Sequence, residues 1–311
     1  MRQSRYRTAA HIATLLTILI WGTTFISSKV LLSDFSPMEI LFTRFLIGYA
    51  ALWIVHPRLI PFQKRAEELL FAAAGLCGVT LYFLLENIAL TYTYASNVGV
   101  IVTVAPFFTA VAAHFILKDE KLHFRFFVGF LIAMIGIALI SWSGSSKLQL
   151  NPLGDLLAVL ACISWALYSI LLRKINQFQY PSIGMTRRVF FYGLIFMLPV
   201  TLISDFRLDL ARFGTGSHLW NFLFLGLGAS ALCYVSWNWS VGILGAIKTS
   251  VYFYLTPVVT VIAAYLLLHE RITGVGIVGI ALTLVGLIVS EQRFLRKRKH
   301  VTDSVTEQGS L

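Results

Sequence analysis

Long apolar stretches alternate with short polar segments along the whole chain. A membrane-spanning helix needs about 20 predominantly apolar residues, and ten stretches come close to that length. Their predicted bounds are 10–32, 37–56, 67–91, 95–117, 124–142, 153–174, 182–204, 218–240, 246–268 and 272–291. The segments between them are too short to form a separate domain. The pattern therefore predicts an all-α polytopic membrane protein with ten transmembrane helices.

The second half of the chain repeats the first, because matching residue types recur at nearly constant spacing. The matched pairs are Trp21 and Trp165, Lys29 and Arg173, Pro37 and Pro181, Arg44 and Arg188, Asn87 and Asn238, Pro106 and Pro257, Glu120 and Glu270, Gly129 and Gly279, and Gly136 and Gly286. Each half holds five spans, an odd number, so the second half enters the membrane from the opposite side. We expect two inverted five-helix repeats at 10–142 and 153–291, a polar linker at 143–152 and a basic tail at 292–311.

Composition and charge narrow the class of protein further. Of the 311 residues, 58% are hydrophobic and 13% are charged, too little polar surface for a soluble globule of this size. The net charge of +11 does not indicate a nucleic-acid partner, because most Lys and Arg residues lie in segments on the side of the N-terminus. That asymmetry predicts a multi-pass protein of the cell membrane with both termini in the cytoplasm. We expect the basic tail to contact anionic lipid headgroups.

The chain lacks the sequence signals of a cofactor or metal site. Cys77, Cys162 and Cys233 fall inside predicted spans, without the spacing of a disulfide framework or a zinc site. The 7 histidines are scattered, with no HExxH pair, and no GxxxxGK[ST] phosphate-binding motif occurs. We expect no cofactor, no metal and no ATP hydrolysis, so energy for any transport comes from a gradient or from a partner.

Two segments in each half carry a family resemblance. WGTTFISSK at Trp21 to Lys29, Arg44 in the next span, and ALTYTYASNVGVIVTVAPFFTAVAAHFILKDE at Ala89 to Glu120 resemble the EamA-type module of the drug/metabolite transporter superfamily. The second half is similar to the same module in WALYSILLR from Trp165, in Pro181 to Arg188, and in VGILGAIKTSVYFYLTPVVTVIAAYLLLHE from Val241. It departs from the first half at Ala166, which replaces a glycine, and at Lys248, which replaces Asn97. The likeness covers nearly all of the chain apart from its tails.

The resemblance implies a fold and a general function. It implies a cavity lined by the first to fourth and sixth to ninth helices, with the fifth and tenth as outer supports. It also implies a secondary transporter, working as an exporter of a small organic metabolite such as an amino acid by alternating access. The module serves carriers of unrelated compounds, so it does not identify the substrate. Protons are a candidate coupling ion, and we expect a monomer or a weak homodimer. The alternatives are an integral-membrane enzyme and a non-transporting membrane scaffold.

Charged side chains inside the spans are the first candidates for substrate contact, because a charge at the bilayer centre costs at least about 2.5–3.5 kcal/mol. By the helical rise, Glu86 lies roughly 7 Å and Arg44 about 10 Å from the outer ends of their helices. Three interpretations stay open for them: a buried pair with each other, a substrate carboxylate on Arg44, or proton exchange at Glu86. Arg188 has no repeat-related acid, because Trp237 stands where Glu86 would be. It either reaches the headgroups or meets an anionic group of the substrate.

Polar side chains of the third and eighth helices extend the candidate site. Tyr82 and Asn87 share a helix face with Glu86. Tyr234, Trp237 and Asn238 form the corresponding set. The asparagines either join helices through hydrogen bonds or line the cavity, and we favour the cavity.

Aromatic residues near the middle of the membrane complete the candidate site. Trp21 shares its face with Thr24 and Ser28, and Trp165 shares its face with Tyr168 and Ser169. These rings either pack between helices or contact the substrate. The remaining candidates are Tyr252, Tyr254, Asn97 and Lys248.

Prolines and glycines predict the remaining architecture. Pro106 and Pro257 interrupt the fourth and ninth helices near mid-membrane, as static kinks or as hinges. Pro37 and Pro181 start helices. Gly129 and Gly136, with their counterparts Gly279 and Gly286, are seven apart and form small faces for close helix packing.

Overall fold

A computed structural model describes residues 2–92, 98, 101–117, 120–143, 151–204, 206, 212, 216–268 and 273–291. These residues form ten helices, several of which consist of consecutive helical segments with separate labels. Seven helical spans are long and apolar enough to cross a membrane. The predicted all-helical, polytopic architecture is confirmed. Asn97, Glu270, most of the linker and the tail 292–311 lie outside the described residues, as does the side chain of Lys29.

The helices fall into two series of five spans. The first series comprises α1 (Arg2–Leu31), α2 (Pro37–Val55), the continuous α3 (Arg65–Gly75), η1 (Leu76–Leu81) and α4 (Tyr82–Tyr92), then α6 (Ala105–Ile116) and α7 (Phe124–Ser143). The second comprises α8 (Pro152–Ile175) with η2 (Asn176–Phe178), α9 (Ser182–Ile203), the continuous α10 (Gly216–Leu223), η4 (Phe224–Leu232) and α11 (Cys233–Leu244), then α12 (Ala246–Ser250), η5 (Val251–Tyr254) and α13 (Leu255–Leu268), and finally α14 (Gly274–Glu291).

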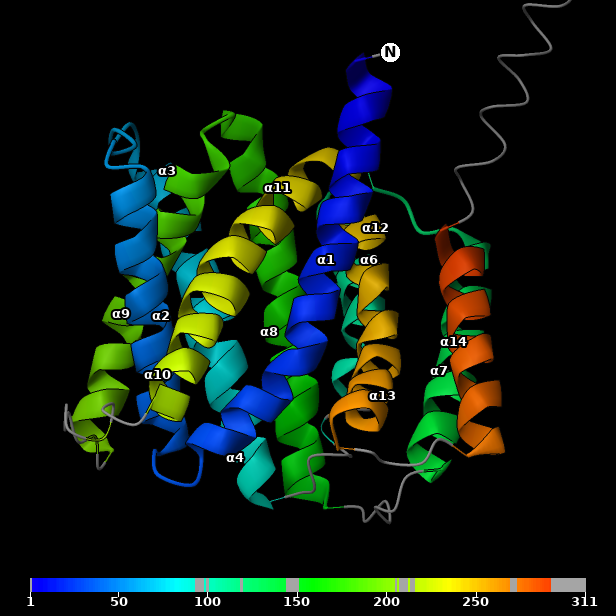
Figure 1. Cartoon of the computed structure of the whole chain (residues 1–311). Coiled ribbons are helices and arrows are strands. Elements are labelled where there is room, and N and C mark those ends of the chain that lie inside the picture. Colours follow the sequence, from blue (N-terminus) through cyan, green and yellow to red (C-terminus); the bar gives the residue numbers. More distant parts are fainter. Residues whose placement is uncertain are drawn as a thin grey trace, which may run out of the picture.

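The two series run in opposite directions. In Figure 1, α1 descends from the labelled N-terminus, whereas α8 ascends from the opposite end of the bundle. We call the end where α1 begins and α14 ends the N-terminal face, and the end where α1 stops and α2 begins the distal face. The two series of helices therefore start at opposite faces, which is the inversion that the odd number of spans predicts.

Local sequence explains where α2 starts. Ser36 is its N-cap and accepts a hydrogen bond from the backbone N–H of Glu39, whose carboxylate in turn accepts one from the N–H of Ser36. This reciprocal capping box satisfies two backbone donors that the first turn would otherwise leave unpaired. Pro37 follows at the first helical position, where a missing N–H costs nothing.

Wide π-helical turns interrupt the third and eighth spans at corresponding places, η1 and η4. Side chains from other helices bond to the carbonyls of these turns. Ser164 donates to the carbonyl of Cys77, Tyr234 to that of Gly78 and Trp21 to that of Ala229. The apolar pattern gives no sign of these π turns, because a π turn changes hydrogen bonding without changing hydrophobicity.

The two prolines lie just after breaks in their helices. Pro106 falls in the first turn of α6, after a turn at residues 103–104, and Pro257 falls in the first turn of α13, after the 3₁₀ segment η5. Neither position requires the backbone N–H that proline lacks. The helices thus restart one residue before Pro106 and two residues before Pro257.

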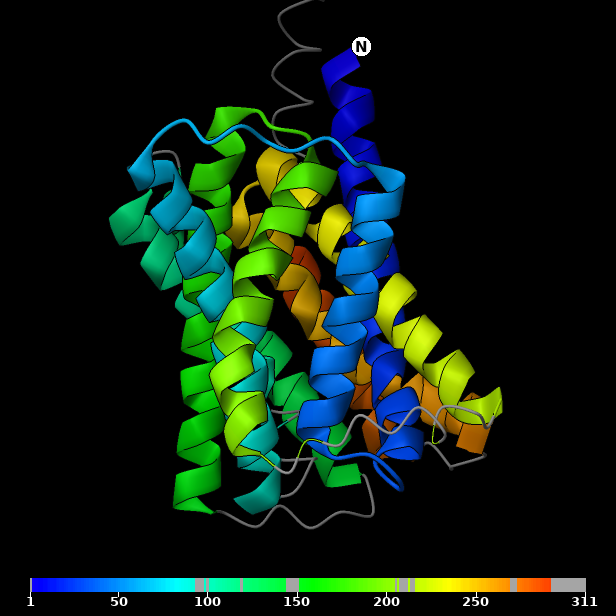
Figure 2. The same cartoon turned by 90° about the vertical axis from the view of Figure 1, so that its left-hand side faces the viewer.

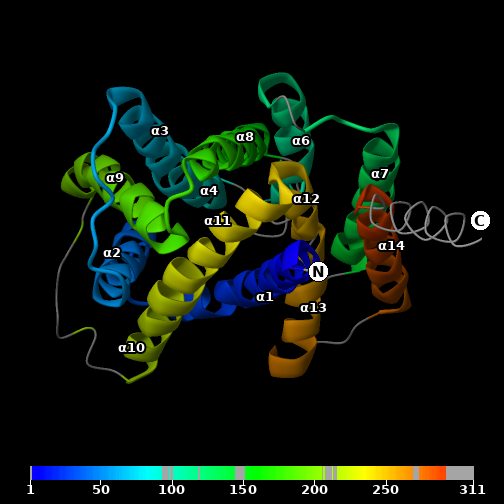
Figure 3. The same cartoon turned by 90° about the horizontal axis from the view of Figure 1, so that it is seen from above.

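Helices α7 and α14 pack side by side at the edge of the bundle (Figure 3), where they also contact η5 and α13. Glycine faces bring their backbones together. A Cβ on Gly129 would lie 2.6 Å from the carbonyl oxygen of Gly286, and one on Gly136 would lie 2.6 Å from that of Gly279. This is the supporting pair implied for the fifth and tenth spans.

Residues 56–64 cross the N-terminal face between α2 and α3 (Figure 2). Two adjacent arginines of α9, Arg187 and Arg188, bind the backbone of this segment, and Arg188 donates to the carbonyl of Ile60. Arg187 donates to the carbonyls of His56 and Arg58, and its guanidinium lies 4.2 Å from the ring centroid of Trp53. The segment is thus bound to the other half of the chain.

Candidate functional site

A cavity of about 330 Å³ lies between the two halves. This volume is within the range of small-molecule sites, about 300–1,000 Å³. Its lining residues are Trp21, Thr24, Ser28, Leu32, Pro37, Ile40, Leu41, Arg44, Tyr82, Phe83, Glu86, Asn87, Val102, Trp165, Tyr234, Phe253 and Thr256. The lining follows α1 from Trp21 to Leu32 and reaches the first residue of α2, so the cavity extends to the distal face.

Aromatic rings close the cavity toward the N-terminal face. Trp21 lies at the centre, with ring centroids 5.6 Å from Trp165, 5.7 Å from Tyr234 and 5.3 Å from Trp237. Phe253 stacks on the Trp21 ring at 5.9 Å. Such rings present flat apolar surfaces with specific edge and face contacts. We refer to these five residues as the aromatic floor.

Arg44 is buried in α2 and lines the cavity. Its Nε donates to Ser230 Oγ at 3.0 Å, and its guanidinium lies 5.2 Å from the ring centroid of Phe83. No other hydrogen bond or ion pair to this guanidinium occurs among the described residues. Its terminal amino groups can therefore bind an anionic group in the cavity, and the guanidinium geometry suits a carboxylate.

Glu86 lines the same cavity from α4, and the two charges are close enough to interact electrostatically. They form no ion pair, and the Glu86 carboxylate has no hydrogen-bond partner within the described ranges. The interpretation in which the two residues neutralise each other directly therefore does not describe this structure. The cavity instead presents a guanidinium and a carboxyl group that are not bonded to each other.

The repeat-related asparagines lie in different environments. Asn87 lines the cavity, but Asn238 is fully buried. Asn238 accepts a hydrogen bond from the Tyr168 hydroxyl at 2.5 Å and donates to Thr186 Oγ1 at 2.8 Å. Its backbone carbonyl accepts a bond from Asn176 at 3.1 Å. The prediction that Asn238 and Tyr168 line the cavity is therefore wrong, since their polar groups join helices α8, α9 and α11.

Arg188 lies outside the cavity lining, contrary to the alternative in which it meets an anionic group of the substrate there. It forms an ion pair with Glu68 at 3.4 Å and donates to the carbonyl of Ile60. The repeat-related position of Glu86 holds Trp237, so the partner of Arg188 comes from a different position of the first half. Glu68 begins the third span at the same depth as Arg188, so it supplies the missing acid at the N-terminal face.

The residues before Pro257 also differ from expectation. Phe253 lines the cavity, whereas the Tyr252 hydroxyl bonds to His11 Nδ1 at 2.7 Å and the Tyr254 ring packs near Phe130. Segment η5 is a 3₁₀ helix, and three residues per turn direct neighbouring side chains to separate faces. Trp237 packs behind Trp21 without lining the cavity.

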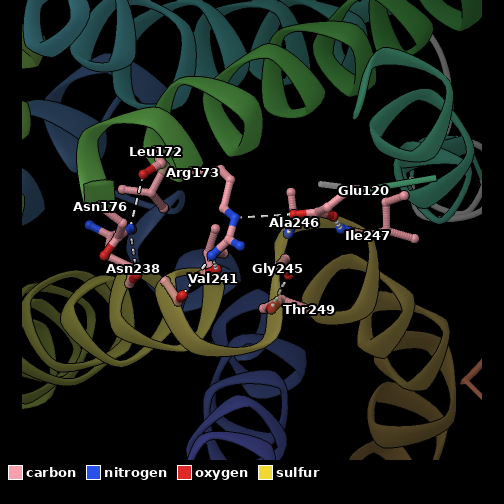
Figure 4. Close-up of polar contacts among 11 residues, drawn as sticks. Glu120, Leu172, Arg173, Asn176, Asn238, Val241, Gly245, Ala246, Ile247 and Thr249 are labelled. Atoms are coloured by element: carbon pink, nitrogen blue, oxygen red, sulfur yellow. Dashed lines mark hydrogen bonds and ion pairs between the residues drawn. The ribbon is translucent and has the colours of Figure 1, made fainter. Parts of the chain in front are cut away.

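A second polar cluster, at the N-terminal face, was not predicted as functional (Figure 4). Glu120, between α6 and α7, accepts hydrogen bonds from the backbone N–H groups of Ala246 at 2.7 Å and Ile247 at 2.8 Å. Arg173, in the last turn of α8, lies 3.4 Å from the same carboxylate and donates to the Gly242 carbonyl at 2.6 Å. The sequence did hold a signal for this cluster, because the repeat matches both charged residues.

Metal and disulfide chemistry find no support in the described ranges. No group of three or more His, Cys, Asp and Glu residues is arranged there to hold a metal ion. The three cysteines are free thiols in or beside buried helix contacts. The groups available for recognition are therefore a cation, an acid, an amide, hydroxyls and aromatic rings.

Two repeated halves of helices around one cavity are the architecture of a membrane carrier. Comparison with known proteins agrees with this class. The profile of the EamA-like transporter family matches residues 8–142 and 152–291. The chain belongs to this family. It is a multi-pass membrane transporter and not an enzyme.

The relatives span nearly the same length. The chain is 28% identical to an uncharacterized transporter of Archaeoglobus fulgidus, covering 90% of this chain and 96% of that one. It is 27% identical to the uncharacterized transporter YyaM of Bacillus subtilis, covering 86% and 89%. It is 24% identical to a probable terminal-alkyne amino-acid exporter of Streptantibioticus cattleyicolor, covering 93% and 96%.

A solved crystal structure shares the fold. It superposes with a TM-score of 0.76 at 18% sequence identity, and the match covers 91% of this chain and 98% of the other. At this identity the likeness concerns the fold alone. The match over almost the full length of both chains supports the arrangement of helices described above.

Proposed function

We propose that this transporter exports an amino acid with an apolar or aromatic side chain by alternating access. The observation that carries the proposal is the pair of unjoined charges in one cavity. Arg44 offers free guanidinium donors to a carboxylate, and Glu86 offers a carboxylate to an ammonium group. The aromatic floor offers apolar surface for the side chain of the amino acid.

Electrostatics favours a zwitterion over a singly charged substrate. A buried charge without a partner is costly, and removing one partner of a pair leaves the other uncompensated. An anion would satisfy Arg44 and leave Glu86 unpaired, and a cation would do the reverse. A zwitterion satisfies both and adds no net charge to the cavity. The relative named as an amino-acid exporter supports the same substrate class.

The direction follows from the topology we propose. The N-terminal face carries the basic segments, so we place it in the cytoplasm of a cell whose plasma membrane holds the chain. The cavity then extends to the outside, as in the release step of an exporter. Glu86 is also our candidate for proton coupling, because a carboxylate that takes either a proton or the substrate ammonium makes the two compete. Residues of one copy line the cavity, and we expect a monomer or a weak homodimer.

Binding to the purified protein in detergent tests the two charged contacts separately. We expect Arg44→Gln to weaken binding of leucine or phenylalanine about tenfold to a hundredfold, since a lost charge-assisted hydrogen bond costs about 1.5–3 kcal/mol. The same variant should not weaken binding of the carboxamide analogue, which has no carboxylate. Glu86→Gln should likewise weaken binding of the amino acid but not binding of the N-acetyl analogue, which has no ammonium group.

The repeat provides a matched control for this experiment. Arg188→Gln makes the same chemical change at the corresponding position outside the cavity, where Arg188 bonds to Glu68 and Ile60. It should leave amino-acid affinity unchanged. Equal loss of affinity in the Arg44 and Arg188 variants, or loss that ignores the carboxylate of the ligand, would contradict the proposed binding mode.

A further inference from the structure

The cluster around Glu120 lies at the N-terminal face, where it joins the two halves of the chain. Glu120 belongs to the first half, between α6 and α7, whereas Arg173, Ala246 and Ile247 belong to the second. The carboxylate bonds at once to two backbone N–H groups and one guanidinium. Its side chain is 10% exposed and that of Arg173 is 22% exposed. Charge-assisted bonds of this kind are roughly twice as strong as neutral ones.

The backbone of the second half is shaped to receive this carboxylate. Gly245 separates α11 from α12 with a φ of 93°, a conformation that residues with a Cβ rarely adopt. A Cβ at this position would also lie 2.7 Å from Glu120 Oε1. The break at Gly245 frees the N–H groups of Ala246 and Ile247 from helical bonding, so both point at the acid (Figure 4).

The cluster lies on the path from the cavity to the N-terminal face. On α8, Trp165 belongs to the aromatic floor, and Tyr168 bonds to Asn238 one turn further along. Arg173 follows Trp165 by eight residues, or about 12 Å of helix. A substrate leaving the cavity toward this face must pass the floor, then the Tyr168 contact, and last the cluster around Glu120.

From this placement we infer that Glu120, Arg173 and the backbone N–H groups of Ala246 and Ile247 form a latch. It holds the pathway shut at the N-terminal face while the cavity extends to the distal face. The latch must break once in each transport cycle to let α8, α11 and α12 separate from Glu120. Glu120 and Arg173 are thus positioning residues that set the balance between the two states, and they do not contact substrate in the cavity.

The latch is testable by thiol labelling from each side of the membrane. Ser169 is fully buried, lies between Trp165 and Arg173 and differs from cysteine by one atom. In a chain whose native cysteines are replaced by alanine, Ser169→Cys reports access from the N-terminal face. We expect a membrane-impermeant maleimide on that side to label it slowly. Adding Glu120→Gln should raise the labelling rate roughly tenfold, because weakening a charge-assisted contact shifts a two-state balance.

A second reporter separates opening of the latch from unfolding. Thr24 lines the cavity on the distal side, so Thr24→Cys reports access from the opposite face. If Glu120→Gln shifts the balance between states, labelling of Thr24→Cys must fall as labelling of Ser169→Cys rises. A rise at both sites indicates local unfolding and overturns the latch, as does an unchanged rate at Ser169→Cys.

The matched control breaks a similar ion pair at the same face. Glu68→Gln removes the partner of Arg188, also 3.4 Å away, but α3 and α9 stay in contact near Gly75 and Val189. It should leave both labelling rates unchanged, and acceleration equal to that in Glu120→Gln would overturn the proposal. The latch rests on the alternating access of the proposed function. Labelling needs no substrate, so failure to bind amino acids and failure of the latch remain distinguishable.

Discussion

At the scale of single residues, identical amino acids at repeat-related positions have different roles. Asn87 lines the cavity, whereas Asn238 is bonded between helices. The sequence could place both in their helices at matching depth. It could not show that Tyr168 and Thr186 lie beside one asparagine only, since those contacts come from two other helices. The same limit explains why Arg44 and Arg188 differ.

This difference predicts opposite outcomes for one substitution. Asn238→Ala should lower the free energy of unfolding by about 1–2 kcal/mol, because it leaves buried hydroxyls of Tyr168 and Thr186 without their partner. Asn87→Ala should leave stability nearly unchanged and weaken substrate binding. Thermal unfolding in detergent, with and without amino acid, measures both effects. Equal stability of the two variants would show that the buried bonds of Asn238 contribute nothing.

At the scale of helices, the apolar pattern located the spans but not their internal geometry. The predicted bounds 37–56 and 182–204 match α2 and α9 closely. The π turns of η1 and η4 and the 3₁₀ turn of η5 leave no trace in hydrophobicity. These turns nevertheless determine which side chains face the cavity. The turn at η5 directs Phe253 inward, and η4 places Ser230 beside Arg44.

The glycine faces of α7 and α14 predicted close helix packing, because glycines seven residues apart let backbones approach in a membrane, but they did not identify the two helices as each other's partners. Gly136→Ala tests the close packing directly. Its Cβ would lie 2.6 Å from the carbonyl of Gly279, so the helices must separate, and we expect a loss of about 1–3 kcal/mol in stability. Gly274→Ala is the matched control, since nothing lies within 4 Å of a Cβ there. Thermal unfolding of both variants is the measurement, and equal melting temperatures would refute the close packing.

At the scale of the whole molecule, inversion is the feature that connects fold and function. Two halves of similar structure and opposite direction enclose one cavity, and in the proposed alternating access two related arrangements of the chain expose that cavity to either face. The sequence predicted the inversion from an odd number of spans per half. It did not reveal which face the structure closes, because that depends on the aromatic floor and the Glu120 latch, whose members come from both halves.

Transport of an amino acid across a membrane is the central claim. The most direct measurement is counterflow in proteoliposomes that contain the purified chain. Vesicles loaded with unlabelled leucine or phenylalanine should accumulate the labelled compound from outside. External carboxamide or N-acetyl analogue should compete less than the amino acid, and a sugar or nucleoside should not compete. Arg44→Gln vesicles should accumulate little. Absence of amino-acid counterflow in the unaltered protein, or competition by the carboxamide or the N-acetyl analogue as strong as that by the amino acid itself, would contradict the account.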